Sequence, residues 1–574
     1  MTPAELFRET IKPDGKPDRL LKQYEGMKFI FGNPVSEYIG GVKRGETAKD
    51  KWGVTKTFEK NAPGPMPVIN DELKVLKDIT HWQDYVHAPD IVNNCQDGWE
   101  SCQKAAKEIN DDGYLSAFVM GTGIFEQCHY LMGFEDTLTN LYEHPAEMHE
   151  LIDYILDFRM RYAKLLIDNV HPDVILSHDD WGTKDALFMK RDMWREFFKE
   201  PYRKFYSYMK SEGVIVIHHA DSYCADIVDD MVEIGIDVWQ GVLPENDIPT
   251  LLHHLQGKMV LMGGIGAAID TPVSTESEIY TYTKNLLNEC APYGGFIPCI
   301  TYGLPGAIYK HVDAVIDRTI DEYNSVLHAR EFRSTKPVRR RKIAVVESGE
   351  ETSAIEEKKS TDSAVLSEIV ENLRKGRKNR VVKRVEKALS DGIDPQEILS
   401  RGLVVGMTMV GDDFSRNKVF IPEMLMAARC MNAATDILKP YLINTDSIGK
   451  GKVCIGTVKG DTHDLGKNLV RIMMEGYGLT VVDLGVDVPA EKFIETAMNE
   501  KCDIICCSAL LTTTMAEMKK IVDLAKTCGI RDKVKIQIGG APITQKYCDE
   551  IDADIYTADA ARAARRAVRA IENK

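Results

Sequence analysis

Residues 456–469, with the sequence GTVKGDTHDLGKNL, constrain this chain more than any other stretch. The apolar run 453–455 precedes them and a helical pattern follows them, and a strand that leads into a loop and then a helix opens a βαβ unit. The loop contains Asp461, His463 and Gly466. A carboxylate two residues from an imidazole can take the proton of one ring nitrogen, which makes the other nitrogen a better metal ligand. The glycine lets a bulky group approach the backbone.

Two later strand ends carry small or hydroxyl residues. One apolar strand ends in residues 508–510, Ser-Ala-Leu, before the threonines 512–514, and strand 534–538 ends in Gly539 and Gly540. Such residues at the carboxyl edge of a parallel sheet are typical of nucleotide binding. In this order and spacing, the three motifs resemble the cobalamin-binding domain of methionine synthase and of the corrinoid proteins of anaerobic methyl transfer.

The resemblance implies base-off binding of cobalamin, with His463 replacing the nucleotide tail as the lower ligand of cobalt. Asp461 and Thr514 would continue the proton relay, and Thr514 stands where methionine synthase has a serine. Ser508 would contact the buried base, and the glycines would leave room for the nucleotide. The cofactor-binding set implied in this way is Asp461, His463, Gly466, Ser508, Leu510, Thr514, Gly539 and Gly540.

Length and charge limit the class of protein. The 574 residues predict two or three domains, and the net charge of −16 argues against nucleic acid or an anionic membrane as the main partner. The chain has no apolar run of about 18 residues and no charged-then-apolar leader, so we expect a soluble cytoplasmic protein. Thirteen cysteines in a chain of this length do not form a disulfide framework.

Residues 1–332 alternate short apolar strands with helical patterns, which predicts a (β/α)8 TIM-type barrel in an α/β fold. The chemistry of such a barrel lies at the carboxyl ends of its strands. Several of these ends carry reactive residues, and together they indicate an active site. They are residues 121–127, 178–182, 218–222, 239–241, 263–265 and 296–303.

Residues 214–241 resemble the uroporphyrinogen decarboxylase superfamily, in particular its corrinoid methyltransferase branch. No arginine-rich motif lies within residues 8–45, so decarboxylation of a tetrapyrrole is disfavoured. Members that methylate thiols bind zinc through His-x-Cys and a later cysteine. His218 matches the histidine and Cys299 lies near the place of the last cysteine, whereas Ala220 stands at the middle position.

The resemblance therefore implies a zinc bound by His218 and Cys299, with the third ligand left open between Glu126, Asp180, Cys224 and His219, of which Cys224 and His219 are not at the matched position. The alternative is that no zinc is present, that Cys299 only packs, and that His218 orients or protonates the methyl donor. Both alternatives place His218 at the barrel mouth, because it follows the apolar strand 214–217.

The remainder of the chain divides into three predicted segments. Residues 333–362 contain charge blocks and few large apolar residues, which predicts a linker. Residues 363–447 are helical, rich in methionine, and resemble the small helical cap of corrinoid proteins. Residues 448–574 form the Rossmann-like (flavodoxin-like) cobalamin-binding domain.

These observations favour a corrinoid-dependent methyltransferase of anaerobic one-carbon metabolism. The barrel would take a methyl group from a small donor, and the cobalt of the same chain would receive it. The donor is a methyl ether (including an aromatic O-methyl group), methanol, a methylamine or a methyl halide. The residues expected to activate its leaving group are His218, Asp180, Glu126 and Tyr302.

The implied partners are a second methyltransferase, which passes the methyl group to tetrahydrofolate or a thiol, and a corrinoid reductive activator. Two other classes of function stay open. One is a cobalamin carrier or sensor with an inactive barrel. The other is a cobalamin-dependent mutase, which would bind adenosylcobalamin; the helical segment ahead of the cobalamin motif favours methyl transfer over this class.

Overall fold

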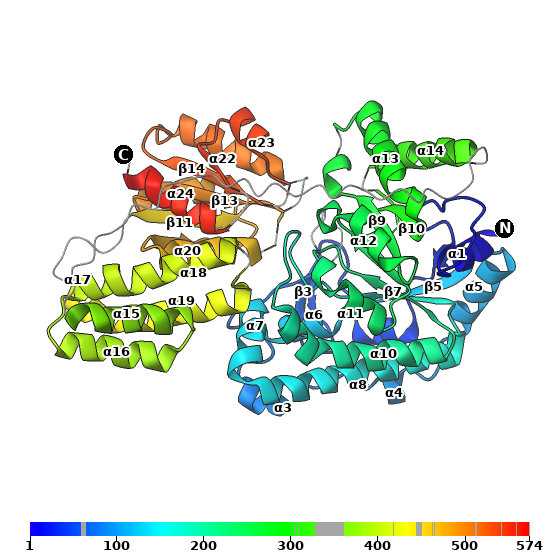
Figure 1. Ribbon diagram of the computed structural model, residues 1–574, viewed down its shortest axis with the longest axis horizontal. Helices are drawn as coiled ribbons and strands as arrows, with labels where there is room; N and C mark the ends of the chain where they lie inside the picture. The colour runs from blue at the N-terminus through cyan, green and yellow to red at the C-terminus, as the bar shows by residue number, and fades with distance from the viewer. Residues whose placement is uncertain are drawn as a thin grey trace.

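The computed structural model describes residues 1–58, 65–271, 273–302, 305–307, 309–327, 361–416, 418–442, 451–461, 463, 465–510, 514–540, 542–557 and 560–572. Most of the predicted linker 333–362 lies outside these residues, as do Gly303, Thr512 and Thr513. Figure 1 shows a barrel-like α/β part on the right and a helical and α/β part on the left.

The first part contains a curled parallel sheet whose strand order is β1-β5-β6-β7-β8-β9-β10. The expected α/β fold is confirmed, with seven paired strands in the described residues where the sequence predicts eight. The backbone N–H of Gln23 donates to the carbonyl of Pro298 at 3.2 Å, so the segment before β1 lies against β10. The strands are β1 Met27–Phe29, β5 Leu115–Met120, β6 Val174–His178, β7 Ile215–His219, β8 Val238–Val242, β9 Val260–Ile265 and β10 Phe296–Ile300.

Helices surround this sheet, and a small antiparallel sheet lies beside it. The helices are α1 Pro3–Thr10, α2 Pro34–Ile39, α3 Trp82–Tyr85, α4 Ile91–Asn94, α5 Glu100–Asp111, α6 Ile124–Met132, α7 Phe134–Glu143, α8 Pro145–Val170, α9 Arg191–Trp194, α10 Glu200–Ser211, α11 Val228–Glu233, α12 Ile248–Leu255, α13 Glu276–Cys290 and α14 Lys310–Leu327. The small sheet contains β2 Thr47–Lys49, β3 Thr55–Thr57 and β4 Met66–Pro67.

Side chains alternate between two cores along the strands of the curled sheet. Ile215 and Ile217 of β7 belong to the inner core, together with residues of the neighbouring strands such as Val238 and Met262. Val216 belongs to the outer core, which the surrounding helices cover. Because successive side chains of a strand point to opposite faces, the last residues of β7 are divided between these two cores as well.

The second part begins with a helical bundle. Its helices are α15 Thr361–Arg374, α16 Lys378–Ser390, α17 Pro395–Glu397, α18 Val405–Ser415 and α19 Ile421–Leu442. Apolar residues at helical spacing, including Ile369, Leu373, Val381 and Val385, are fully buried in it. Met407 and Met424 are buried in the same core, so these methionines pack the bundle.

A five-stranded parallel sheet follows, with the order β12-β11-β13-β14-β15. The first strand of this domain, β11, has β12 on one side, and β13, β14 and β15 follow on its other side, as in flavodoxin-like folds. The strand order therefore reverses between β11 and β13. The elements are β11 Lys452–Thr457, α20 Leu465–Gly476, β12 Thr480–Asp483, α21 Ala490–Asn499, β13 Ile504–Ser508, α22 Met515–Thr527, β14 Lys535–Gly539, α23 Gln545–Glu550, β15 Ile555–Tyr556 and α24 Ala560–Glu572. None of the helices in the described residues has the length and apolar character needed to cross a membrane.

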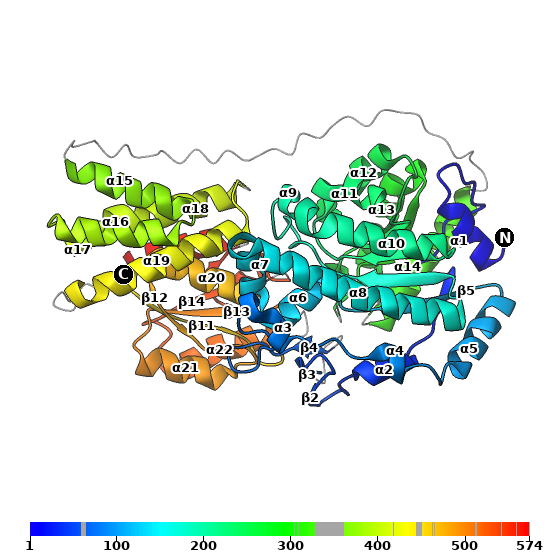
Figure 2. The same ribbon diagram turned by 90° about the horizontal axis from the view of Figure 1, so that it is seen from below.

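The helical bundle packs against the barrel through α19 and α7, which lie side by side in Figures 1 and 2. Arg429 of α19 donates to Asp136 and to Glu143, each at 2.8 Å. Glu423, in the first turn of α19, accepts hydrogen bonds from the side chains of Lys190 and Tyr142. Helix α19 also contacts α20, which packs on the second sheet. The bundle therefore contacts both the barrel and the second sheet.

We expect Arg429→Glu to weaken this docking. The substitution removes two ion pairs, each worth about 0.2–1 kcal/mol, and places a third carboxylate between Asp136 and Glu143. The equilibrium constant for docking should fall by about tenfold, and the radius of gyration in small-angle X-ray scattering should increase. Arg380→Glu, on an exposed face of α16, is the matched control. An unchanged radius for Arg429→Glu would contradict the observed interface.

Candidate functional site

Asp461 is the centre of the hydrogen-bond network at the carboxyl edge of the second sheet. Its Oδ1 accepts from Nδ1 of His463 at 2.6 Å and from the backbone N–H of His463 at 3.1 Å. Its Oδ2 accepts from the backbone N–H of Leu510 at 2.6 Å and from the hydroxyl of Thr514 at 3.2 Å. The carboxylate therefore ties the loop after β11 to the segment after β13.

This network sets the orientation and tautomer of His463. Because Nδ1–H donates to Asp461, Nε2 keeps the lone pair that a metal requires. The Asp461 side chain is fully buried, whereas that of His463 is 26 % exposed. Burial raises the pKa of Asp461, but the hydrogen bonds from His463 and Leu510 and the charge of His463 outweigh it, and the pKa lies below its usual value.

The other predicted cofactor residues lie at the same edge. Ser508 ends β13 and pairs in register with Gly539, which ends β14. A Cβ on Gly466 would meet no atom within 4 Å, so the space in front of α20 is open. Gly540 has a φ of +134°, and a Cβ there would lie 1.8 Å from the carbonyl oxygen of Ala509. The structure thus requires glycine at position 540 for the close approach of two protein segments.

Lys467 was not predicted from the sequence. It lies in the first turn of α20, its side chain is almost fully buried, and its Nζ donates to both carboxylate oxygens of Asp483 at 2.6–2.7 Å. The ion pair ties the start of α20 to the end of β12. A lysine in the first turn of a predicted helix gives no signal of burial, because lysine is normally exposed there.

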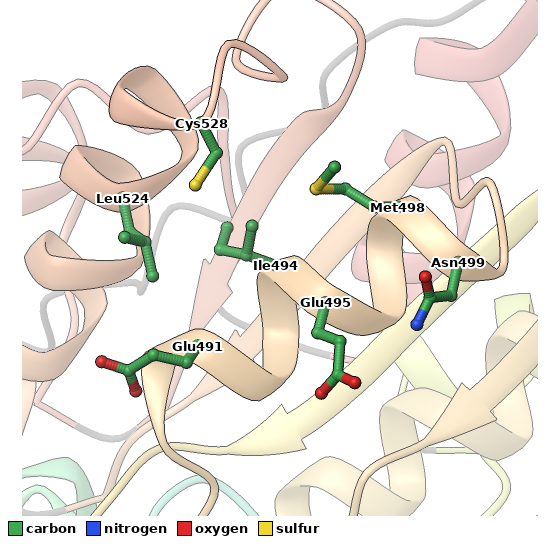
Figure 3. Close-up of a pocket in the computed structure, with 7 residues that line it drawn as sticks. All are labelled: Glu491, Ile494, Glu495, Met498, Asn499, Leu524 and Cys528. Atoms are coloured by element: carbon green, nitrogen blue, oxygen red, sulfur yellow. The ribbon is translucent and has the colours of Figure 1, made fainter.

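A cavity of about 370 Å³ lies between α21 and the end of α22. Figure 3 shows the residues that line it. Ile494, Met498, Leu524 and Cys528 give it an apolar lining. None of the predicted cofactor residues lines it, so it is separate from the edge that carries His463.

The barrel has its own buried carboxylate at the end of β6. Asp179 accepts from the backbone N–H groups of Phe125 and Glu126 at 2.9 and 2.8 Å, and from the hydroxyl of Tyr202. It therefore holds the first turn of α6 against β6. A Cβ on Gly123 would lie 2.2 Å from the Asp179 side chain, so this approach requires glycine. Burial, followed by the charge of Glu126, raises the pKa of Asp179 to about 7.

Glu126 and His178 form an ion pair next to this turn. Nδ1 of His178 lies 2.9 Å from Oε2 of Glu126, and the Glu126 residue is 7 % exposed. Burial lowers the pKa of His178, but Glu126 outweighs it and raises the pKa to about 10, so His178 is protonated at neutral pH. Asp180 lies beside this pair, and burial raises its pKa to about 6. The structure thus brings the predicted residues Glu126 and Asp180 together.

His218 and Cys299 are not brought together. His218 is fully buried on the helix side of β7, stacks on Trp181 with 4.0 Å between ring centroids, and shares a hydrogen bond with Tyr206 of α10 at 2.7 Å. Cys299 lies in the inner core, with its Sγ 3.9 Å from Oε1 of Gln23. In the described residues, neither belongs to a group that could hold a metal ion, and Cys224 does not either.

The histidine that faces the barrel mouth is His219, which the sequence analysis named only as a possible third zinc ligand and not as a catalytic residue. Its Nδ1 is hydrogen-bonded to Oε1 of Gln240, whose Nε2 donates to the carbonyl of Tyr302 at 2.8 Å. The predicted residue Tyr302 thus reaches this network through its backbone. The sequence could have predicted this orientation from the apolar residues Ile215 and Ile217, which face the inner core. His219 lies two positions after Ile217 and therefore faces the same side of the strand.

Comparisons with known proteins divide the chain in the same way. Residues 50–321 match the uroporphyrinogen decarboxylase (URO-D) family, and residues 365–439 and 451–569 match two B12 binding domain families. Dimethylamine corrinoid protein 2 of Methanosarcina acetivorans is 40 % identical over 204 residues, which are 35 % of this chain and 94 % of that protein. Trimethylamine corrinoid protein 1 of the same organism is 45 % identical over 173 residues, 30 % of this chain and 80 % of that protein.

Two solved structures are similar over parts of the chain. The methanol:cobalamin methyltransferase complex of Methanosarcina barkeri is 30 % identical, with a TM-score of 0.35, and the match covers 37 % of this chain and 81 % of that one. A methyltransferase from Methanosarcina mazei is 15 % identical, with a TM-score of 0.42, and the match covers 56 % of this chain and 99 % of that one.

We expect Asp461→Asn to destabilise the C-terminal domain. The amide cannot accept all four hydrogen bonds, so buried donors lose their partner at a cost of about 1–3 kcal/mol in the free energy of unfolding. Because the pKa of Asp461 is lowered in the folded protein, the stabilisation by its carboxylate is fully present above the pKa of the unfolded state, about 3.9. This stabilisation is lost as the pH falls through the pKa of the folded state. The difference from wild type should therefore be large at pH 7 and shrink below about pH 4.

Urea unfolding followed by circular dichroism measures this difference. Asp532→Asn, an exposed aspartate of the same domain, is the control and should behave as wild type at both pH values. An Asp461→Asn protein as stable as wild type at pH 7 would contradict the role assigned to the carboxylate.

Proposed function

Because this chain belongs to the B12-binding corrinoid proteins through its C-terminal part, fused to a uroporphyrinogen decarboxylase-like methyltransferase domain, we propose that it moves a methyl group from a small donor to a corrinoid held by its own C-terminal domain. The observation that carries the proposal is the His463–Asp461 pair, with its Nε2 lone pair, in the same chain as a polar barrel mouth. We also propose that the corrinoid binds in its base-off form. The protein would act in the cytoplasm, in anaerobic one-carbon metabolism.

The residues at the sheet edge fit a corrinoid. His463 would be the lower ligand of cobalt, Asp461 and Thr514 would hold its proton relay, and the open space at Gly466 would admit the macrocycle. Bound cobalamin supplies a nucleophilic cobalt that accepts the methyl group. Ser508, between two neighbouring strand ends, would contact the nucleotide at the point where the strand order reverses.

The barrel mouth acts on the leaving group of the donor. The bond between the methyl carbon and its heteroatom breaks, and both electrons of the bond stay on the heteroatom, which then needs a proton or a cation. His178, kept protonated by Glu126, would donate this proton. Asp180 lies beside the pair and would orient the donor.

The donor belongs to one of four classes: methyl ethers including aromatic ones, methanol, methylamines and methyl halides. The names of the relatives add weight to methylamines, but these relatives match only the corrinoid half, whereas the barrel selects the donor. We propose that a second methyltransferase then passes the methyl group to tetrahydrofolate or a thiol, and that a reductive activator restores the corrinoid.

A donor panel tests the proposal. We expect the full chain, loaded with reduced corrinoid, to methylate it from at least one of the four donor classes, measured by the change in corrinoid absorbance. Glu126→Gln should lower the rate by about 10²-fold or more while corrinoid binding is unchanged, because His178 loses the charge that keeps it protonated.

The control for this experiment is Glu289→Gln, an exposed residue of α13, which should match wild type. A wild-type chain that binds corrinoid but accepts no methyl group from any donor would favour the carrier or sensor. Rearrangement of a thioester with adenosylcobalamin would favour the mutase.

The lower ligand has its own test. In wild-type protein with cob(II)alamin, electron paramagnetic resonance should show coupling to one nitrogen of histidine, and His463→Ala should lose it. His254→Ala, on the exposed end of α12, is the control and should keep the coupling. An unchanged spectrum for His463→Ala would show that another group is the ligand.

A further inference from the structure

A buried arginine of α8 contacts the two segments that carry Glu126 and His178. Arg159 is 3 % exposed, and α8 packs against α6 and α10. Its Nη1 donates to two backbone carbonyls after β5, and its Nη2 donates to the hydroxyl of Ser177 at 2.9 Å. We propose that Arg159 is a positioning residue for the Glu126–His178 pair. It acts by holding these two segments together and not by touching the methyl donor.

The first contact holds the turn between β5 and α6. Nη1 of Arg159 donates to the carbonyl of Gly121 at 3.4 Å and to the carbonyl of Thr122. Thr122 has a φ of 55°, in the left-handed region that a β-branched residue rarely adopts, so the turn requires contacts that hold it. The next residue, Gly123, donates its backbone N–H to Oε2 of Glu126 at 3.1 Å. The turn that Arg159 holds therefore determines where this carboxylate oxygen lies.

The second contact holds the strand that carries His178. Ser177, the residue before it in β6, is fully buried and accepts from Nη2 of Arg159. The oxygen of Glu126 that accepts from the turn also lies 2.9 Å from Nδ1 of His178. One guanidinium thus joins the turn that precedes Glu126 to the residue that precedes His178. Because the guanidinium is planar and rigid, it keeps the two segments at a fixed separation.

The surroundings of Arg159 show why these contacts persist. A buried cation is costly unless hydrogen bonds or an opposite charge compensate it. In the part of the chain that the structure describes, Arg159 forms no ion pair with a carboxylate. The two carbonyls, the hydroxyl and the ring of Phe205, whose centroid lies 4.8 Å from the guanidinium carbon, compensate the charge instead. If the turn moved away, the guanidinium would lose two of its three hydrogen-bond acceptors.

Other groups hold the opposite side of the same turn. The hydroxyl of Tyr202 accepts from the backbone N–H of Ile124, and Asp179 accepts from the next two N–H groups. Arg159 supplies the donors for the carbonyl groups, whereas Asp179 and Tyr202 supply the acceptors for the N–H groups. Loss of Arg159 should therefore loosen the turn without unfolding α6.

Hydrogen–deuterium exchange of the full chain, without corrinoid or donor, tests the positioning. In Arg159→Gln we expect the amides of residues 121–126 to exchange about tenfold faster than in wild type or more, while the amides of β9 are unchanged. Arg161→Gln, a partly exposed residue of the same helix that pairs with Asp157, is the matched control and should exchange as wild type. Wild-type exchange in a folded Arg159→Gln protein overturns the inference.

Methyl transfer gives a second readout, which rests on the proposed function. Arg159→Gln should lower kcat by about tenfold or more and leave the KM of the donor within about twofold, because Arg159 does not touch the donor. In the Glu126→Gln background, the same substitution should lower kcat by less than about twofold, because Arg159 acts through Glu126. An equal loss of kcat in both backgrounds would show that Arg159 acts by another route, and would overturn the inference.

A second variant carries the test if circular dichroism shows that Arg159→Gln does not fold. Arg159→Lys keeps the positive charge, but an ammonium lacks the planar fork that reaches both the turn and Ser177. The same faster exchange is expected, and wild-type exchange overturns the inference.

The remaining outcomes separate this inference from the proposed function. Faster exchange of residues 121–126, in a protein whose wild type accepts no methyl group from any donor, leaves the positioning in place and refutes the proposed function. Methyl transfer at the wild-type rate by Arg159→Gln refutes the positioning, while the proposed function stands.

Discussion

A buried aspartate that accepts several hydrogen bonds from neighbouring segments holds each of the two sites of this protein together. In the C-terminal domain, Asp461 binds the imidazole and backbone of His463 and the N–H of Leu510. In the barrel, Asp179 binds the first turn of α6 and the hydroxyl of Tyr202. A buried carboxylate is costly unless its oxygens are satisfied, so both loops must adopt the conformations that satisfy them. The side chains of His463 and Glu126, for which we propose functional roles, are oriented as a consequence.

The two sites are also connected along the chain. Helix α6 carries Glu126 in its first turn and leads within two residues into α7, which packs against α19 of the helical bundle. Helix α19 contacts α20, whose N-terminus follows the His463 loop. The contacts between α7 and α19 include charged pairs that are about one-third exposed, such as Arg429 with Asp136. Such pairs contribute little stability each, which suits an interface that must open if a bound corrinoid is to approach the barrel mouth.

The barrel illustrates how one residue of register changes the chemistry. His218 and His219 are adjacent, but they point to opposite faces of β7. His218 lies among the aromatic rings of Trp181, Tyr202 and Tyr206, where burial lowers its pKa. His219 instead faces the carboxylates of the mouth. A family pattern placed on the first histidine therefore selects a residue of the outer core, whereas the second lies at the mouth.

The sequence alone predicted the order of the segments and the flavodoxin-like domain, and through the family resemblance it predicted the residues around Asp461 that we propose bind the cofactor, because these motifs depend on local spacing. Asp-x-His and the strand ends at Ser508 and Gly539 are short-range patterns, and the parallel sheet brings such ends to one edge whatever the remaining side chains are. The barrel mouth depended on tertiary structure. Which of two adjacent histidines faces inward is set by the packing of the whole strand, and the close approach of Asp180 to Asp221 joins two strands that are separated by more than thirty residues. Burial of Lys467 and the close approach of Gly540 to Ala509 are likewise decided by contacts distant in sequence, which no local pattern records.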